Sequence, residues 1–164
     1  MNNMNEPFDI VEKSDWTPVS SMIKVIGVGG GGCNAVNYMY REKVEGCSFI
    51  VCNTDEQALR GSPVPVKIHI GKDALGAGTD PAKGRTAALE ALERIDKIVL
   101  GPETQMLFIT AGMGGGTGTG AAPIIAKRAK DKGILTVAVV TIPFENEGTS
   151  PLARAIDGIH ELVK

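Results

Sequence analysis

A run of glycines and threonines separates two regular segments in the second half of the chain. Residues 112–120 hold six glycines and two threonines in nine positions. A plain turn would not need so much glycine, because each glycine costs backbone entropy on folding. Amides that surround an anion explain the composition, and the hydroxyls of Thr117 and Thr119 would add donors. The run therefore predicts a phosphate-binding loop. In it, a bulky side chain at Gly116 or Gly118 would occupy the space of phosphate oxygens, whereas Gly84 lies outside it.

A second glycine run, residues 29–32, follows an apolar strand pattern and precedes a helix that we expect to begin near Cys33. Amides at the start of a helix are unpaired and lie at the positive end of its dipole, so they favour phosphate. The spacing Gly-x-Gly-x-x-Gly over residues 27–32 is weak evidence by itself. Glycines that only permit a tight turn from strand to helix explain it equally well.

Asp55 is the acidic residue best placed to act beside these loops. It follows the strand pattern of residues 48–52, in the sequence Asn53-Thr54-Asp55. A carboxylate there could act on a cation such as Mg²⁺ through water, or on the ligand itself. The alternative is that Asp55 caps a short helix over residues 56–59.

No lysine enters the glycine loops in the pattern of ordinary P-loop NTPases. That pattern is Gly-x-x-x-x-Gly-Lys-Ser/Thr, but Lys72, which follows a glycine, is itself followed by Asp73. The charge of a bound phosphate would therefore be met by backbone amides, helix dipoles and a cation.

Composition argues against several other functions. The formal net charge of -2 gives no general attraction to nucleic acid or to an anionic membrane. The three cysteines lack metal-ligand spacing and the two histidines are isolated, so we expect no protein-built metal site and reduced thiols, as in a cytoplasmic protein. The acidic N-terminus does not resemble a signal peptide, and no segment reaches the roughly 20 apolar residues of a membrane span.

Strand and helix patterns alternate from residue 22 onward. Strands are expected over residues 22–28, 48–52, 66–70, 106–110 and 134–141. Helices are expected between them, and a last one should end the chain. This order predicts an α/β fold of the Rossmann-like, doubly wound class, with a mostly parallel sheet. Residues 1–21 are polar and lack a period, which predicts a flexible arm before a domain of residues 22–164.

Two helix starts can be assigned from capping residues. Asp80 is a suitable N-cap with proline directly after it, and Ser150 stands in the same relation to Pro151. In the last helix, an apolar stripe at helical spacing should face the core. Its members are Leu152, Ile156, Ile159 and Val163.

Together these motifs resemble the tubulin superfamily, and within it the FtsZ family. The run of residues 114–120 is similar to the superfamily's signature loop. Residues 23–35, 53–59, 75–81 and 143–148 resemble, in chain order, the first, second, third and fifth nucleotide loops of the FtsZ family. The resemblance implies a tubulin/FtsZ-type GTPase domain that binds GTP and GDP with Mg²⁺. It also implies self-association into head-to-tail filaments that build the bacterial division ring in the cytoplasm, together with other division-ring proteins.

The resemblance also assigns roles to single residues. It places phosphate contacts in the two glycine runs and the γ-phosphate near the third loop, with Asn34 toward the nucleoside and Glu147 on the ribose. The complete set of candidate nucleotide-binding residues is Gly29, Gly30, Gly31, Asn34, Asn53, Asp55, Ala77, Gly78, Thr79, Gly114, Gly115, Gly116, Thr117, Gly118 and Glu147.

Three departures from the family pattern affect these expectations. The loop of residues 71–75 is shorter, and Pro151 replaces an arginine that contacts the nucleotide in many members, with Arg154 one helical turn away. The family's central helix and its second domain, which brings catalytic acids to the neighbouring subunit, are absent. We therefore expect no catalytic residue in this chain and negligible turnover by the chain alone.

Two other functions remain as alternatives. A dinucleotide-dependent oxidoreductase is the first, because a strand precedes the spacing of residues 27–32 and Asp55 lies near the end of the next strand. It leaves the loop of residues 112–120 without a role. The second alternative is a non-enzymatic module that caps filaments.

Overall fold

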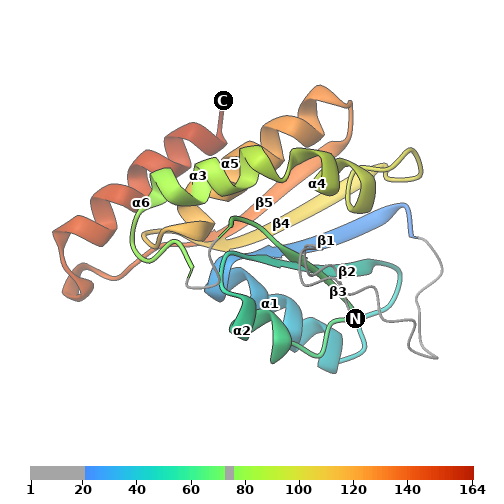
Figure 1. Ribbon diagram of the computed structural model, residues 1–164, viewed down its shortest axis with the longest axis horizontal. Coiled ribbons are helices and arrows are strands. Elements are labelled where there is room, and N and C mark those ends of the chain that lie inside the picture. Colours follow the sequence, from blue (N-terminus) through green and yellow to red (C-terminus); the bar gives the residue numbers. More distant parts are fainter. Residues whose placement is uncertain (1–20, 73–75) are drawn as a thin grey trace, which may run out of the picture.

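The computed structural model describes residues 21–72 and 76–164, which form a five-stranded sheet with helices on both sides (Figure 1). All pairings are parallel and the strand order is β3-β2-β1-β4-β5. The predicted doubly wound α/β class is confirmed. The strands are β1 (Ile23–Val28), β2 (Ser48–Asn53), β3 (Val66–His69), β4 (Met106–Gly112) and β5 (Leu135–Thr141).

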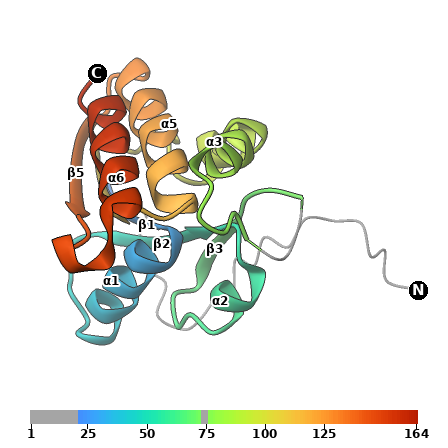
Figure 2. The ribbon, with the colours of Figure 1, turned by 90° about the vertical axis from the view of Figure 1, so that its left-hand side faces the viewer.

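The helices divide unequally between the two faces of the sheet (Figure 2). On one face lie α1 (Gly29–Arg41) and α2 (Glu56–Arg60). The other face carries α3 (Pro81–Glu90), α4 (Leu92–Ile98), α5 (Thr117–Asp131) and α6 (Thr149–Leu162), and a short 3-10 helix, η1 (Glu145–Glu147), precedes α6. We call the second side the covered face, because its helices bury the side chains that β1 and β4 direct toward them, among them Ile26, Leu107 and Ile109.

Both glycine runs enter helices earlier than expected. The first helix begins at Gly29, not near Cys33, and α5 begins at Thr117, so that only residues 113–116 separate it from β4. Glycine disfavours a helix interior but costs little in its first turn, where the amides have no intrahelical partners. The glycine residues therefore form helix N-termini, and very little free loop remains.

Helix boundaries elsewhere agree with the capping residues in one case and not in the other. Asp80 caps α3 as expected, its carboxylate accepting a hydrogen bond from the Ala82 N–H at 2.9 Å. Ser150 does not cap α6, because the N-cap is Gly148, two residues earlier; the Ser150 hydroxyl accepts from Arg154 instead.

The buried side of α6 also differs from the expected stripe. Ile156 is 46% exposed and Val163 is 75% exposed, while Ala155 and Gly158 make the buried contact. A Cβ at Gly158 would lie 2.5 Å from the Thr119 Cγ2 on α5. Close approach of two helix backbones, which small residues permit, therefore decided the orientation of α6.

Strand β5 is the edge of the sheet and is poorly covered. Among the described residues no strand pairs with its outer side. By their register with β4, Leu135 and Val139 point to the face of α1 and α2. Neither helix extends over β5 (Figure 2), and these side chains are 61% and 60% exposed. Beside them a hollow of about 420 Å³ is lined by Ile23, Met39 and Phe108. We call this apolar surface the open face.

Candidate functional site

The two glycine-rich helix starts meet where the strand order reverses, between β1 and β4. Helix α1 follows β1 and α5 follows β4, and these strands are neighbours. The backbones come so close that a Cβ at Gly29 would lie 2.8 Å from the Gly118 nitrogen. In doubly wound folds this reversal at the carboxyl ends of the strands is the usual place for a ligand.

Neither helix N-terminus is closed by a side chain. The N-caps of α1 and α5 are Val28 and Gly116, neither of which makes a side-chain cap hydrogen bond, and the first turns hold no acidic residue. Two helices of 13 and 15 residues thus direct unpaired amides and positive dipole ends at one place. Such an arrangement suits an anion, as the sequence predicted.

We call the two glycine-rich helix starts, residues 29–32 and 114–118, the cradle. Its glycines differ in what surrounds them. A Cβ at Gly30 or at Gly115 would meet nothing within 4 Å, and both residues are exposed. A Cβ at Gly116 would instead lie 2.6 Å from the Gly78 oxygen, and one at Gly118 would lie 2.5 Å from the Gly112 oxygen. The expectation that side chains at Gly116 and Gly118 would fill ligand space is therefore wrong, because they would collide with the fold.

Gly84, which the sequence places outside the phosphate-binding loop, packs against that loop. It lies on α3, where a Cβ would be 2.5 Å from the Gly116 oxygen. A side chain at Gly84 would therefore displace the backbone of the cradle at Gly116. Gly61, at the end of α2 with a φ of -76° and no neighbour closer than 3.8 Å, is the neutral glycine that Gly84 was expected to be.

The two threonines of the signature run have different tasks. Thr117 Oγ1 lies 2.6 Å from Thr54 Oγ1, and both side chains are buried. Thr119 Oγ1 accepts a hydrogen bond from the Gly114 N–H at 2.8 Å inside the protein. Thr119 therefore fixes the shape of the loop. The structure does not support the expectation that its hydroxyl faces a ligand.

The turn after β2 is fixed by its own side chains. Asn53 is buried, and its Oδ1 accepts from the Thr54 N–H at 2.9 Å. Asp55 Oδ1 accepts from the Ala58 N–H at 3.0 Å, so the alternative that Asp55 caps a short helix is correct. One carboxylate oxygen of Asp55 is engaged in that cap, and the half-buried residue lies at the same edge of the sheet as the cradle.

The segment of residues 76–80 is fastened to the glycine cradle. The Gly116 N–H donates to the Gly78 oxygen at 3.1 Å, and the Ala77 N–H donates to Thr54 Oγ1 at 2.9 Å. Gly78 and Thr79 are exposed beside this junction. Because the Gly116 amide already has a partner, the neighbouring amides are better candidates for an anion.

Residues at the rim are exposed or engaged with the loops. Asn34 is exposed on α1. Exposed Glu147 accepts from the Phe144 N–H at 2.9 Å, and Arg154 donates to the Gly114 oxygen at 2.8 Å. The sequence left open whether Arg154 takes the place of the arginine expected at position 151. Its guanidinium contacts the second glycine run through the Gly114 carbonyl.

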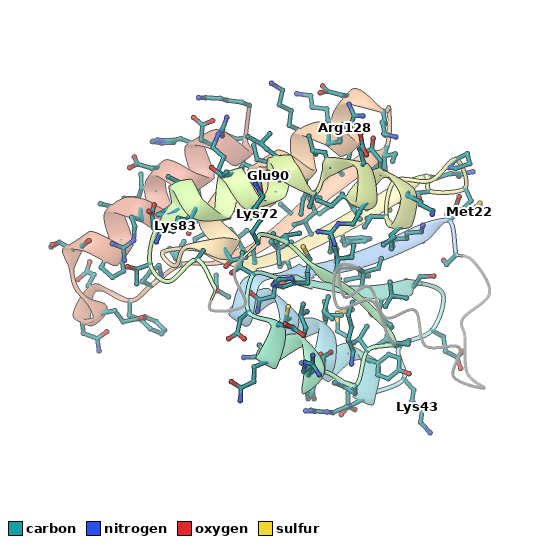
Figure 3. The ribbon with its side chains drawn as sticks, viewed as in Figure 1. Met22, Lys43, Lys72, Lys83, Glu90 and Arg128 are labelled. Carbon is teal, nitrogen blue, oxygen red and sulfur yellow. The ribbon has the colours of Figure 1, made fainter. Side chains whose placement is uncertain are left out.

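Lys72 points away from the cradle. Its ammonium lies 3.1 Å from a carboxylate oxygen of Glu90 on α3 (Figure 3). Lys72 therefore does not take the place of the lysine found in ordinary P-loop NTPases. The remainder of the shortened loop, residues 73–75, lies outside the described residues, as does the expected arm except for Ser21.

Titratable chemistry is sparse at the site. In the described ranges no three His, Cys, Asp or Glu side chains gather as a metal cluster. Burial raises the pKa of the Cys33 thiol to about 12, so this cysteine beneath the first glycine run stays protonated. A hydrogen bond from Arg128 lowers the pKa of Asp96, but this carboxyl group lies on α4 and not in the glycine runs. A hollow of about 770 Å³ between α5, α6 and β5 also lies apart from the cradle.

A membrane span is not found either: none of the helices in the described part of the chain is both long enough and apolar enough to cross a bilayer.

Comparison with known proteins agrees with the geometry. Residues 22–164 match the family described as "Tubulin/FtsZ family, GTPase domain". Cell division protein FtsZ from Pseudomonas putida is 54% identical over 93% of this chain and 39% of its own length. The FtsZ of Aquifex aeolicus is 54% identical over 85% of this chain and 38% of its own length. The chain thus spans about two fifths of these curated relatives.

Solved structures give the same picture. An FtsZ dimer from M. jannaschii matches with a TM-score of 0.82 and 42% identity, over 88% of this chain and 42% of that one.

The oxidoreductase alternative is not favoured. Its glycine spacing has a packing reason, since a Cβ at Gly27 would lie 2.4 Å from the Gly32 oxygen and one at Gly32 would lie 2.1 Å from the Thr110 oxygen.

Proposed function

The chain belongs to the Tubulin/FtsZ family, and from this premise we propose that residues 22–164 form a guanine-nucleotide-binding domain with GTP and GDP as ligands. The observation that carries the proposal is the meeting of two uncapped helix N-termini at one point of a parallel sheet. Their unpaired amides compensate phosphate charge without a lysine. The whole protein would be a GTPase that forms filaments in cell division.

The phosphates would lie against the first turns of the two helices. Gly30, Gly31, Gly115, Thr117 and Gly118 are the proposed contacts, since the amide of Gly116 already has a partner. In this proposal the remaining candidates have neighbouring roles: Gly29, Gly114 and Asn53 shape the backbone, Ala77, Gly78 and Thr79 face the terminal phosphate, Asn34 faces the nucleoside, and Glu147 faces the ribose.

Mg²⁺ would be held mainly by phosphate oxygens and water. A hard cation of this kind commonly keeps several waters and uses only one or two protein carboxylates. Asp55 fits, because its Oδ1 caps α2 and its other carboxylate oxygen can accept from a bound water. When bound, the cation would neutralise charge that builds up on the terminal phosphate.

Hydrolysis would need protein beyond these residues. Attack by water requires a group that orients the water and takes its proton. Asp55 and Glu147 each already accept a backbone N–H with one oxygen and suit the cation and ribose better. In our proposal the catalytic acids come from the second domain of the next subunit in a head-to-tail filament. That filament would belong to the division ring in the cytoplasm.

Calorimetry tests nucleotide binding directly. We expect GTP and GDP to bind in the presence of Mg²⁺, and more weakly without it. ATP should be rejected less well than by the full-length FtsZ of Pseudomonas putida, because the contacts proposed within residues 22–164 are mainly to the phosphates that all nucleotides share. Absence of binding for every nucleotide at millimolar concentration would end the proposal.

Three valine variants locate the phosphates. Gly30→Val and Gly115→Val place side chains where the fold leaves open space, so they should preserve folding and weaken nucleotide binding by about tenfold or more. Gly61→Val is the matched control, since it adds the same side chain to an exposed glycine outside the cradle. Normal binding by both cradle variants would show that the ligand lies elsewhere.

A phosphate-release assay tests the shared active site. The chain alone should release negligible phosphate at any concentration. Adding the C-terminal part of a close relative, such as the Pseudomonas putida FtsZ, should restore measurable release. Robust turnover by the isolated chain would contradict the shared site while leaving nucleotide binding intact.

A further inference from the structure

The hydroxyl of Thr54 connects three segments of the proposed site. Thr54 is the first residue after β2 and is 4% exposed. Its Oγ1 accepts the Ala77 N–H at 2.9 Å and lies 2.6 Å from the Oγ1 of Thr117, the first residue of α5. A single oxygen atom therefore joins the β2 turn, the segment of residues 76–80 and the glycine cradle.

Thr54 is itself held firmly. Its N–H donates to Asn53 Oδ1 at 2.9 Å, and its carbonyl oxygen lies 3.1 Å from His69 Nε2. The strand that precedes it is buried on both faces. The hydroxyl is thus a fixed point to which the other two segments are attached.

The contact between the two hydroxyls can run in either direction, and a bound phosphate would select one of them. A threonine hydroxyl has one hydrogen and two acceptor lone pairs, and a phosphate oxygen without a proton only accepts. If Thr117 is to donate its hydrogen to phosphate, it cannot also donate to Thr54. Thr54 must then donate to Thr117 while it accepts from Ala77. The bond from the Ala77 amide is compatible with this direction, since it uses a lone pair of Thr54 and leaves the Thr54 hydrogen free to donate.

We propose that Thr54 is a positioning residue that couples the segment of residues 77–79 to the phosphate cradle and thereby sets the preference for nucleoside triphosphate over diphosphate. The inference rests on the proposed function. Thr54 does not contact the ligand in this proposal; it orients the Thr117 hydroxyl and holds Ala77 beside the terminal phosphate. A diphosphate uses only the first of these effects, whereas a triphosphate uses both.

The test compares affinities for GDP and for a non-hydrolysable GTP analogue by calorimetry with Mg²⁺ present. Thr54→Val keeps the shape but removes the hydroxyl, so the ratio of triphosphate to diphosphate affinity should fall by about tenfold. Thr54→Ser keeps the hydroxyl and should leave the ratio within about threefold of the wild type. Thr54→Cys, with a weak donor and acceptor, should lie between them and provides a second variant if valine prevents folding.

A matched control separates positioning from stability. Thr104 is also buried, and its hydroxyl donates to the Val99 oxygen at 2.8 Å, in the segment between α4 and β4. Thr104→Val should lower the thermal stability of the free chain without changing the affinity ratio. A Thr54→Val variant that behaves in the same way would overturn the positioning role.

The outcomes also separate this inference from the function beneath it. If the wild type binds nucleotides and the ratio is unchanged in both Thr54→Val and Thr54→Cys, only the role of Thr54 is wrong. If the wild-type chain binds no nucleotide, the proposed function is wrong and this role is overturned with it.

Discussion

The covered face and the open face of the sheet are built from similar side chains but have different surroundings. Leu107 on β4 points to the covered face and is fully buried beneath α3, α4 and α5. Leu135 on the neighbouring strand β5 points to the opposite face and is 61% exposed. Parallel strands are normally buried on both faces, and the apolar sequence of β5 is typical of that environment. The difference teaches that β5 has the composition of a core strand in a place that the described residues leave uncovered.

The largest expected effect comes from truncating the same residue type on each face. Leu107→Ala removes fully buried atoms and should lower the free energy of unfolding by about 3 kcal/mol. Leu135→Ala should change it by about 0.5 kcal/mol or less, because most of its side chain already contacts water. Urea denaturation of both variants measures the contrast. Equal losses would mean that the open face is covered in solution.

A smaller effect is expected where helices of the covered face touch through glycine. A Cβ at Gly120 on α5 would lie 2.0 Å from the Pro81 oxygen on α3. Gly120→Ala should therefore separate the two helices and cost about 2 kcal/mol in thermal or urea unfolding. Gly61→Ala, on the other side of the sheet and free of close neighbours, is the control and should be nearly neutral. A stable Gly120→Ala variant would show that α3 shifts easily on the sheet.

The smallest effect concerns an ion pair at the outside of the covered face. Asp96 on α4 accepts from the Arg128 Nε at 3.0 Å, and Lys132 lies 3.3 Å away. The hydrogen bond from Arg128, followed by that from Lys132, holds the pKa of Asp96 below its ordinary value against the opposing effect of burial. The folded state therefore favours the ionised form, so this stabilisation is present above about pH 4 and is lost as pH falls through the lowered pKa.

Thermal unfolding across pH tests that sign. Asp96→Asn should melt below the wild type at neutral pH, by less than Leu107→Ala, and the two curves should converge in acid once Asp96 is protonated. A gap between wild type and Asp96→Asn that persists at pH 2 would assign the effect to packing of the side chain instead of its charge.

Sequence alone predicted the class of fold and that two glycine runs follow strands of the sheet, because both depend on local patterns. Alternating strands and helices fix a doubly wound sheet, and glycine after two of its strands marks where they end. What the sequence could not supply is which contacts cross between segments. Gly84 and Gly116 are far apart in the chain, and only the packing of α3 on α5 joins them.

The residues that sequence reasoning misjudged share this cause. The sequence motif around Thr54 does not single this residue out, because its hydroxyl contacts Ala77 and Thr117, which are distant in the chain. The apolar stripe of α6 is confirmed for Ile159, which packs against the core, and wrong for Ile156 and Val163, which are exposed. Gly158 allows a close approach to α5 that periodicity does not describe. One signal was available for Thr54: a hydroxyl residue directly after a buried strand, at the edge where the loops gather.

The free edge of β5 governs how the chain behaves when it is purified and stored. The Leu135 N–H donates toward β4, to the Gln105 oxygen, so by alternation the peptide groups of Thr136, Ala138 and Val140 point outward. Residues 134–142 contain no charge and no proline, the features by which edge strands normally avoid pairing with other molecules. Because no strand among the described residues pairs with this edge, we expect concentrated preparations to lose material as one sheet adds to another. The concentration at which the chain is kept then sets how much of it stays monomeric.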